Sequence, residues 1–178
     1  MLKVNVRKAL DLHKIQEFYR RSEVEILVGF PSGRQHVETL HRKKDGKYKD
    51  DFGDPAEAKP QETAELAKEL HYGTAVIPAR PFLDEGIASK KEELRKTIQK
   101  QLENLHEGKT ANWDKVGTMA VGAVNEFVRG EYYKEHVPNS PKTIEYKESD
   151  KPLIDGGDLI GALTFVVDGK VHQEEGKK

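Results

Sequence analysis

The sequence VPNSPKTIEYKESDKPLIDGGDLIGALTFVV, residues 137–167, carries the densest run of backbone constraints in the chain. Its prolines fix φ and remove backbone donors, whereas its paired glycines permit positive φ. Ser140-Pro141 predicts the N-cap and first residue of a short helix, and PLIDGGD predicts a turn. Alternating apolar residues after the turn indicate one face of a closing strand, formed by Leu163, Phe165 and Val167. A segment so constrained and so poor in nucleophiles favours a role in shape and assembly over catalysis.

The composition predicts a modest core and much exposed chain. Of 178 residues, 35% are hydrophobic and 34% are charged, so the apolar fraction is below that of an ordinary soluble domain. A net charge of −1 excludes the strongly basic kind of nucleic-acid binder. The lack of cysteine excludes disulfides, thiolate metal sites and cysteine nucleophiles. No apolar run approaches the roughly 18 residues of a membrane span, and the N-terminus lacks a signal-peptide core. We therefore expect a soluble protein made inside a cell, without a membrane partner.

The N-terminal part predicts a strand, a helix and a second strand. Apolar residues alternate over residues 2–6, which indicates a short strand. They follow helical spacing over residues 10–21, with two arginines in the last turn, where cations suit the helix dipole. The segment EVEILVGF, residues 23–30, alternates again and ends at Pro31-Ser32-Gly33.

Residues 31–60 form the least apolar stretch, with seven basic and six acidic side chains. The stretch exceeds the roughly 12–15 residues that are normal for a loop inside a compact domain. We therefore predict a long charged arm or hairpin, turning near Asp45-Gly46. Ordering it costs about 1–2 kcal/mol per residue, so we expect the arm to be mobile in the free subunit. A solvated loop is favoured over a binding element, and ordering against the charges of a neighbouring subunit is the alternative. Trypsin should then cut free subunits first between Arg34 and Lys59 and spare assembled ones.

Further along, QETAELAKELHYG, residues 61–73, predicts a helix that ends at Gly73. TAVIPARPFL follows as an extended segment. Asp84 is then predicted to cap the longest helix, which runs to about His106. This helix carries one narrow apolar stripe, formed by Ile87, Leu94, Ile98, Leu102 and Leu105.

A cleaner helical pattern from about Asn112 to Arg129 predicts the central core helix, in which Gly117 and Gly122 allow a neighbour to approach closely. The order of elements predicts an α+β fold, with a small antiparallel sheet packed against two main helices and a long extended arm. We expect one domain over residues 1–178, ending in a disordered polar tail from about residue 171.

A search for catalytic and metal-binding patterns favours a protein without enzymatic activity, metal or cofactor. The seven histidines are scattered, and none form the i, i+4 pair of a helical metal site. Asp155 and Asp158 are the one carboxylate pair in a constrained turn, so a hydrolase using them is a third hypothesis; turn and capping roles explain them better. The sequence has neither a nucleophile elbow nor a phosphate-binding loop.

The segment RKKDGKYK, residues 42–49, is the basic cluster of the chain, and Tyr48 within it is a candidate stacking group. Its candidate contact residues are Arg42, Lys43, Lys44, Lys47 and Lys49. Neighbouring aspartates dilute this charge, which favours a solubilising loop tip. A small nucleic-acid-handling protein that uses this loop is the alternative hypothesis.

Three segments together, in this order and separated by two helices, resemble a known family. They are AELAKELHYGT (64–74), IPARPFLDEGI (77–87) and PNSPKTIEYKESDKPLIDGGDL (138–159). They look like the head–tail joining, or tail-completion, proteins in the neck of long-tailed bacteriophages. The resemblance covers residues from about 23 to 167, and the early strand EILVGFP is similar too. It departs at Gly156, where the family usually has Thr, and at Ile160, where a polar residue is common.

The resemblance implies a structural virion protein at the head–tail junction, made in the bacterial host cytoplasm. Family members form rings, usually of six copies, that finish the tail and shape the passage for DNA without sequence-specific binding. The implied partners are further copies, the head connector or stopper, and the tail tube or tail terminator. No catalytic, cofactor-binding or metal-binding residues come with it. The implied interface or structural residues are Ile77, Pro78, Arg80, Pro81, Phe82, Pro152, Leu153, Asp155 and Leu159.

Overall fold

The computed structural model describes residues 12–33, 35–36, 61–154, 157–168 and 170–172. Within these ranges the helices are α2 (Leu12–Ser22), α3 (Thr63–Tyr72), α4 (Phe82–Ser89), α5 (Lys91–His106), α6 (Trp113–Arg129), α7 (Tyr132–His136), α8 (Pro141–Lys147) and α9 (Asp158–Ala162). The strands are β1 (Ile26–Gly29), β2 (Gln35–His36), β3 (Gln61–Glu62), β4 (Thr164–Val167) and β5 (Lys170–His172). This combination of helices and short strands confirms the predicted α+β class.

A three-stranded antiparallel sheet in the order β1-β4-β5 joins the two ends of the described chain. Both strands that the sequence predicted near 23–30 and after the turn are present as β1 and β4, paired with Val28 opposite Phe165. The predicted face of β4 is buried, since Leu163, Phe165 and Val167 are all in the core. The strand predicted at residues 2–6 lies outside the described residues.

The sequence predicted a polar tail from about residue 171. This start is too early, because strand β5 extends to His172. Residues 171 and 172 belong to β5, in which Val171 pairs with Val166 and His172 pairs with Phe165. Backbone pairing with β4 extends the sheet there, a contact that the polar composition of the segment does not reveal.

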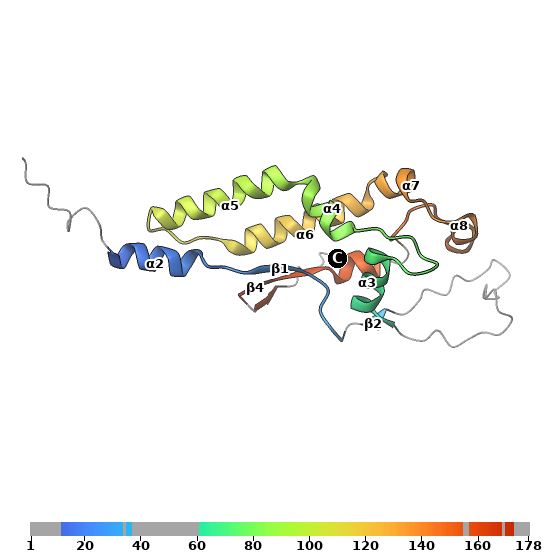
Figure 1. The fold of residues 1–178 in the computed structure, drawn as a ribbon, viewed down its shortest axis with the longest axis horizontal. Coiled ribbons are helices and arrows are strands. Elements are labelled where there is room, and N and C mark those ends of the chain that lie inside the picture. The colour runs from blue at the N-terminus through green and yellow to red at the C-terminus, as the bar shows by residue number, and fades with distance from the viewer. Residues whose placement is uncertain (1–11, 34, 37–60, 155–156, 169, 173–178) are drawn as a thin grey trace, which may run out of the picture.

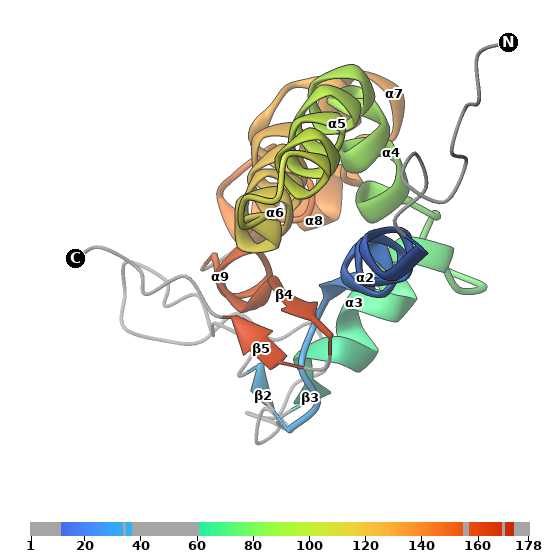
Figure 2. The ribbon, with the colours of Figure 1, turned by 90° about the vertical axis from the view of Figure 1, so that its left-hand side faces the viewer.

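The main helices and the sheet run along the longest axis of the molecule and are stacked in layers across it (Figure 1). Helices α5 and α6 lie side by side, and α6 covers the sheet through contacts with β1 and β4. Figure 2 shows this stack end-on, with α5 and α6 above the strands and with α2 and α3 to one side. The two main helices are therefore those predicted, but α6 is the one that packs directly on the sheet, and α5 packs on α6.

Helix α6 is the central helix, as its sequence pattern predicts. The Asn112 side chain accepts a 3.0 Å hydrogen bond from the backbone N–H of Lys115 and so caps the N-terminus. Gly117 lies against the Phe165 ring, where an added Cβ would come within 2.1 Å of Cδ2. At Gly122, in contrast, no atom of the described part of the chain lies within 4 Å of such a Cβ. A neighbouring side chain therefore approaches α6 closely at Gly117, as predicted, but not at Gly122.

The predicted helix from Asp84 to His106 is wrong in its start and in its continuity. It consists of α4 and α5, separated at Lys90, whose φ of −116° and ψ of 21° leave the helical region. Helix α4 begins at Phe82, so Asp84 lies in its first turn rather than at its cap. The break follows from packing: Gly86 brings α4 so close to α6 that an added Cβ would lie 2.7 Å from the Cα of Val124.

The predicted stripe of α5 is also only partly buried. Leu94 and Leu105 are in the core, whereas Ile98 is 39% exposed. Gln101 takes its place on the inner side, where its Oε1 accepts a 2.8 Å hydrogen bond from the backbone N–H of Asn112. A buried glutamine therefore joins α5 to the start of α6.

Short elements complete the fold. Helix α8 begins as predicted, with Ser140 as N-cap accepting a hydrogen bond from the Thr143 backbone and Pro141 in the first turn. Helices α7 and α9 were not predicted. Strands β2 and β3 pair at the two ends of the predicted arm. Residues 37–60 of the arm, which include the expected turn at Asp45-Gly46, lie outside the described residues.

No helix in the described part has both the length and the apolar character needed to cross a membrane.

Candidate assembly site

The side chain of Arg80 links two of the segments that carry the family resemblance. It is 5% exposed and donates from Nε to the carbonyl of Val137 (3.1 Å) and from Nη2 to the carbonyl of Pro138 (3.2 Å) and to Asn139 Oδ1 (3.4 Å). Burial lowers the pKa of this guanidinium from its ordinary value, although an arginine stays charged in proteins. The three acceptors are neutral, and through them the buried guanidinium holds the extended IPARPF segment against residues 137–139.

Phe82, Leu153 and Leu159 come together in one core cluster, although they are far apart in the sequence. Phe82 is 1% exposed and packs edge-on against Phe30, with ring centroids 6.1 Å apart. Leu153 has a φ of 61°, a left-handed conformation that is costly for a branched side chain. The turn after Pro152 therefore accepts backbone strain, and its Leu153 side chain is buried in the core.

The remaining predicted residues divide between the core, the surface and the undescribed parts. Pro152 is buried, Ile77 and Pro81 are half-buried, and Pro78 is exposed. Asp155 and the arm residues Arg42, Lys43, Lys44, Lys47 and Lys49 lie outside the described residues. Most of the predicted motif residues thus hold their own subunit together.

A second set of contacts ties α7 to its neighbours. The Tyr133 hydroxyl donates a hydrogen bond to Glu85 of α4, and burial, reinforced by that bond, raises the pKa of Tyr133 far above its ordinary value. The Lys134 ammonium lies 3.2 Å from Glu131 and 2.8 Å from Asp150, and its hydrogen bond to Asp150 does most to raise the pKa of Lys134. These contacts connect α4 to α7, and α7 to the segment before Pro152.

The loop between α3 and α4, residues 73–81, is braced by its own backbone. Thr74 donates from its N–H to the carbonyl of Ile77 (2.9 Å), and its Oγ1 accepts from the N–H groups of Val76 and Ile77. Gly73 has a φ of 77°, and an added Cβ there would lie 2.8 Å from the backbone nitrogen of Ala79. The Gly73-Thr74 pair therefore makes a tight turn that only glycine permits.

This braced loop presents apolar side chains to solvent. Val76 is 89% exposed, and Tyr72 at the end of α3 is 74% exposed. We call these two side chains the apolar tip. Sequence reasoning missed these two side chains. The pattern Ala-Val-Ile does not show that Ile77 turns inward and Val76 outward, because the hydrogen bonds of Thr74 set the direction of both side chains.

Beneath the apolar tip lies a buried histidine. His71 is 6% exposed, its Nε2 lies 3.3 Å from Asp84 Oδ2, and its ring packs edge-on against Tyr72 and Phe82. Its Nδ1 has no hydrogen-bond partner among the described residues. The imidazole is thus enclosed by aromatic rings and joins α3 to α4.

Within the described residues, no group of three or more His, Cys, Asp or Glu side chains is placed to hold a metal ion. Asp158, one of the two carboxylates weighed for hydrolysis, is the first residue of α9. Arg80 and Tyr133 are engaged in contacts within the subunit. The apolar tip is exposed at this end of the described chain and is suited to packing against a partner.

Comparison of the chain with protein-family models, with curated proteins and with solved structures finds no match in any of the three.

Proposed function

We propose that this chain is a head–tail joining, or tail-completion, protein of a long-tailed bacteriophage. It is a structural subunit that forms a ring, of about six copies as in rings of the family it resembles, at the head–tail junction of the virion. The ring completes the tail and surrounds the passage through which DNA leaves. Its partners are further copies of the chain, the connector or stopper on the head side, and the tube or terminator on the tail side.

The convergence of the three resembling segments carries this proposal. The first ends in the Gly73-Thr74 turn, and the second follows with Arg80 and Phe82. The third supplies two acceptors of Arg80, at Pro138 and Asn139, and the core partner Leu153. Segments that resemble one family and that also form one packed unit are stronger support than the same segments scattered over a fold would be.

The arrangement also suits a passive structural role rather than catalysis. The buried ionisable groups Arg80, Tyr133 and His71 contact other parts of the same subunit. The apolar tip is exposed, and burial against a partner would remove its apolar surface from water. Such side chains suit a subunit that its neighbours complete.

Two measurements test the proposal. Native mass spectrometry of the purified chain at rising concentration should show a closed oligomer, and gold-labelled antibodies against the chain should bind at the neck of intact particles. A chain that stays monomeric at every concentration and that is missing from particle necks contradicts the proposal.

The nucleic-acid-handling alternative, which uses the basic residues 42–49, predicts a different result in the same preparations. A protein that neutralises several phosphates loses DNA affinity steeply as salt concentration rises. Tight, strongly salt-dependent DNA binding by the monomer, abolished when Lys43, Lys44 and Lys47 are changed to Gln, would favour the alternative.

A further inference from the structure

Arg80 is a buried cation without a carboxylate partner in the described part of the chain. Its three hydrogen bonds run from Nε and Nη2 to neutral acceptors on Val137, Pro138 and Asn139. The other terminal nitrogen, Nη1, donates no hydrogen bond within the described residues. Burial lowers the pKa of the guanidinium, and no carboxylate of the described residues raises it. Because buried charges are normally paired with opposite ones, the charge of Arg80 is left uncompensated.

The neighbouring Asn139 has unused donors as well. Its Oδ1 accepts from Arg80 Nη2 at 3.4 Å, which sets the orientation of the amide. The Nδ2 atom of the same planar amide is buried and has no hydrogen-bond partner among the described residues. An amide nitrogen carries two N–H donors, and buried donors without an acceptor are rare in folded proteins. Two adjacent side chains therefore hold donors that lack an acceptor.

Backbone hydrogen bonds anchor both segments that carry these donors. The N–H of Arg80 donates to the carbonyl of Leu70 in α3 at 2.9 Å. Residues 137–139 follow α7, and the N–H of Val137 donates to the carbonyl of Tyr133 in that helix at 3.0 Å. The donors are thus held in place before any ligand arrives, which lowers the ordering cost of binding.

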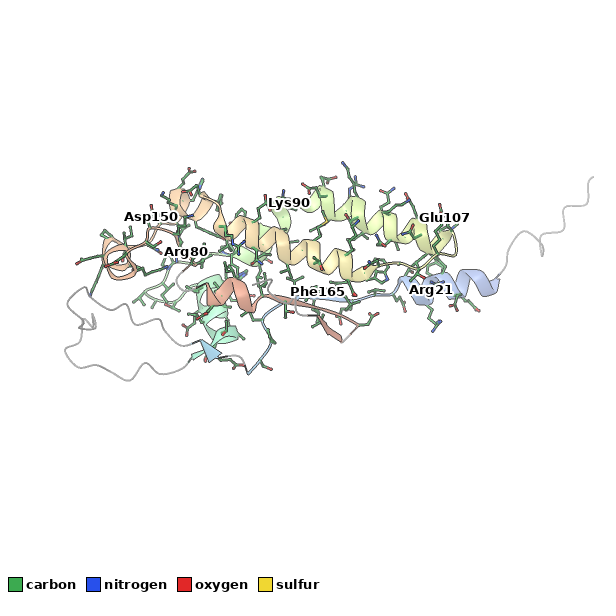
Figure 3. All side chains as sticks on the ribbon, turned by 180° about the vertical axis from the view of Figure 1, so that it is seen from behind. Arg21, Arg80, Lys90, Glu107, Asp150 and Phe165 are labelled. Carbon is green, nitrogen blue, oxygen red and sulfur yellow. The ribbon has the colours of Figure 1, made fainter. Side chains whose placement is uncertain are left out.

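Two carboxylates at this end of the molecule are used by other partners. Figure 3 shows Asp150 at the same end as Arg80, but the Asp150 carboxylate lies 2.8 Å from the ammonium of Lys134. Glu85 accepts the hydrogen bond of the Tyr133 hydroxyl. An anion that compensates Arg80 is therefore expected from outside the subunit.

We propose that Arg80 and Asn139 form a binding site for a small oxyanion, a carboxylate or a phosphate group. A guanidinium matches both groups in shape and charge, and the Asn139 amide adds neutral donors. The site lies just beneath the surface, since Pro138 is exposed and Asn139 is half-buried. Because Arg80 itself is only 5% exposed, a small ion suits the site and a large ligand does not. The site is independent of the ring proposed above.

The Nε–H of Arg80 offers a direct probe by NMR, because its hydrogen bond to Val137 protects it from exchange. Titration of the protein with inorganic phosphate, and separately with acetate, at constant pH and ionic strength should shift this signal until it saturates. Asn139→Asp supplies a carboxylate from within the chain and removes the unpaired Nδ2, so it should weaken the binding several-fold. Asn104→Asp is the matched control. It makes the same change in α5, three residues before Glu107, at the end opposite Arg80, and should respond as the wild type does.

Saturation by phosphate alone identifies a phosphate group as the ligand, saturation by acetate alone identifies a carboxylate, and either result supports the site. No saturable shift with either ion overturns the proposal and leaves Arg80 as an internal brace. A drift that is equal in the wild type, Asn139→Asp and Asn104→Asp means an adventitious ion only and overturns it too. If Asn139→Asp does not fold, the wild-type titration alone decides between these results.

Discussion

Phe82 is the residue whose removal should cost most. Its ring is 1% exposed and lies 5.5 Å from the His71 ring and 6.1 Å from the Phe30 ring, centroid to centroid. Phe82→Ala leaves a cavity there, and such changes cost about 3–5 kcal/mol, a large part of a typical domain's stability. Urea unfolding of the variant should show this loss. The control Val76→Ala, at an 89% exposed position, should stay within about 0.5 kcal/mol of the wild type.

Tyr133 should make the protein sensitive to alkali. Burial and the hydrogen bond to Glu85 raise its pKa in the folded state, whereas an unfolded tyrosine releases its proton near pH 10. The folded state then holds a proton that the unfolded chain has lost. The stabilisation is thus complete below about pH 10, and the free energy of unfolding falls as pH rises further. Unfolding curves at pH 8 and about pH 11 should show a smaller drop for Tyr133→Phe than for the wild type; equal drops would contradict this.

At the scale of the element, two glycines of α6 should respond in opposite directions. Gly117→Ala places a Cβ within 2.1 Å of the buried Phe165 ring and should destabilise the fold by about 1–3 kcal/mol through overpacking. Gly122→Ala has nothing within 4 Å and should stabilise it by about 0.5–1 kcal/mol, because alanine favours the helix. Thermal unfolding of the pair measures both changes. Shifts of the same sign would mean that α6 packs differently on β4.

The elements that sequence reasoning predicted well carry their own local signals. Asn112 and Gly130 bound α6, Ser140-Pro141 starts α8, and alternation marks β1 and β4. The break at Lys90 has no such signal, because the surrounding residues are good helix formers and the break is imposed by the contact of Gly86 with α6. The short helices α7 and α9 depend on tertiary contacts in the same way.

At the scale of the whole molecule, the sequence predicted where most of the larger helices and strands lie but not which of their side chains and loop residues face outward. Arg80 and Phe82 are buried within the subunit, whereas Val76 and Tyr72 are exposed. Exposure depends on a network of backbone and threonine hydrogen bonds in residues 73–77, which no hydrophobic pattern encodes. The recess between α2 and α5, lined by Phe18, Leu102 and His106 among others, is beyond sequence reasoning for a related reason, since it arises where two helices far apart in the chain meet.

Assembly should make thermal stability depend on protein concentration. Association of folded subunits stabilises them by mass action, so the melting temperature of the wild type should rise with concentration. Val76→Asp places a charge on the apolar tip without touching the core and should remove this rise. The single tryptophan, Trp113, is partly buried against the core, so its fluorescence reports unfolding directly. At the lowest concentration both proteins should melt together, which shows that the fold is intact. A variant that keeps the wild-type concentration dependence would mean that the apolar tip takes no part in assembly.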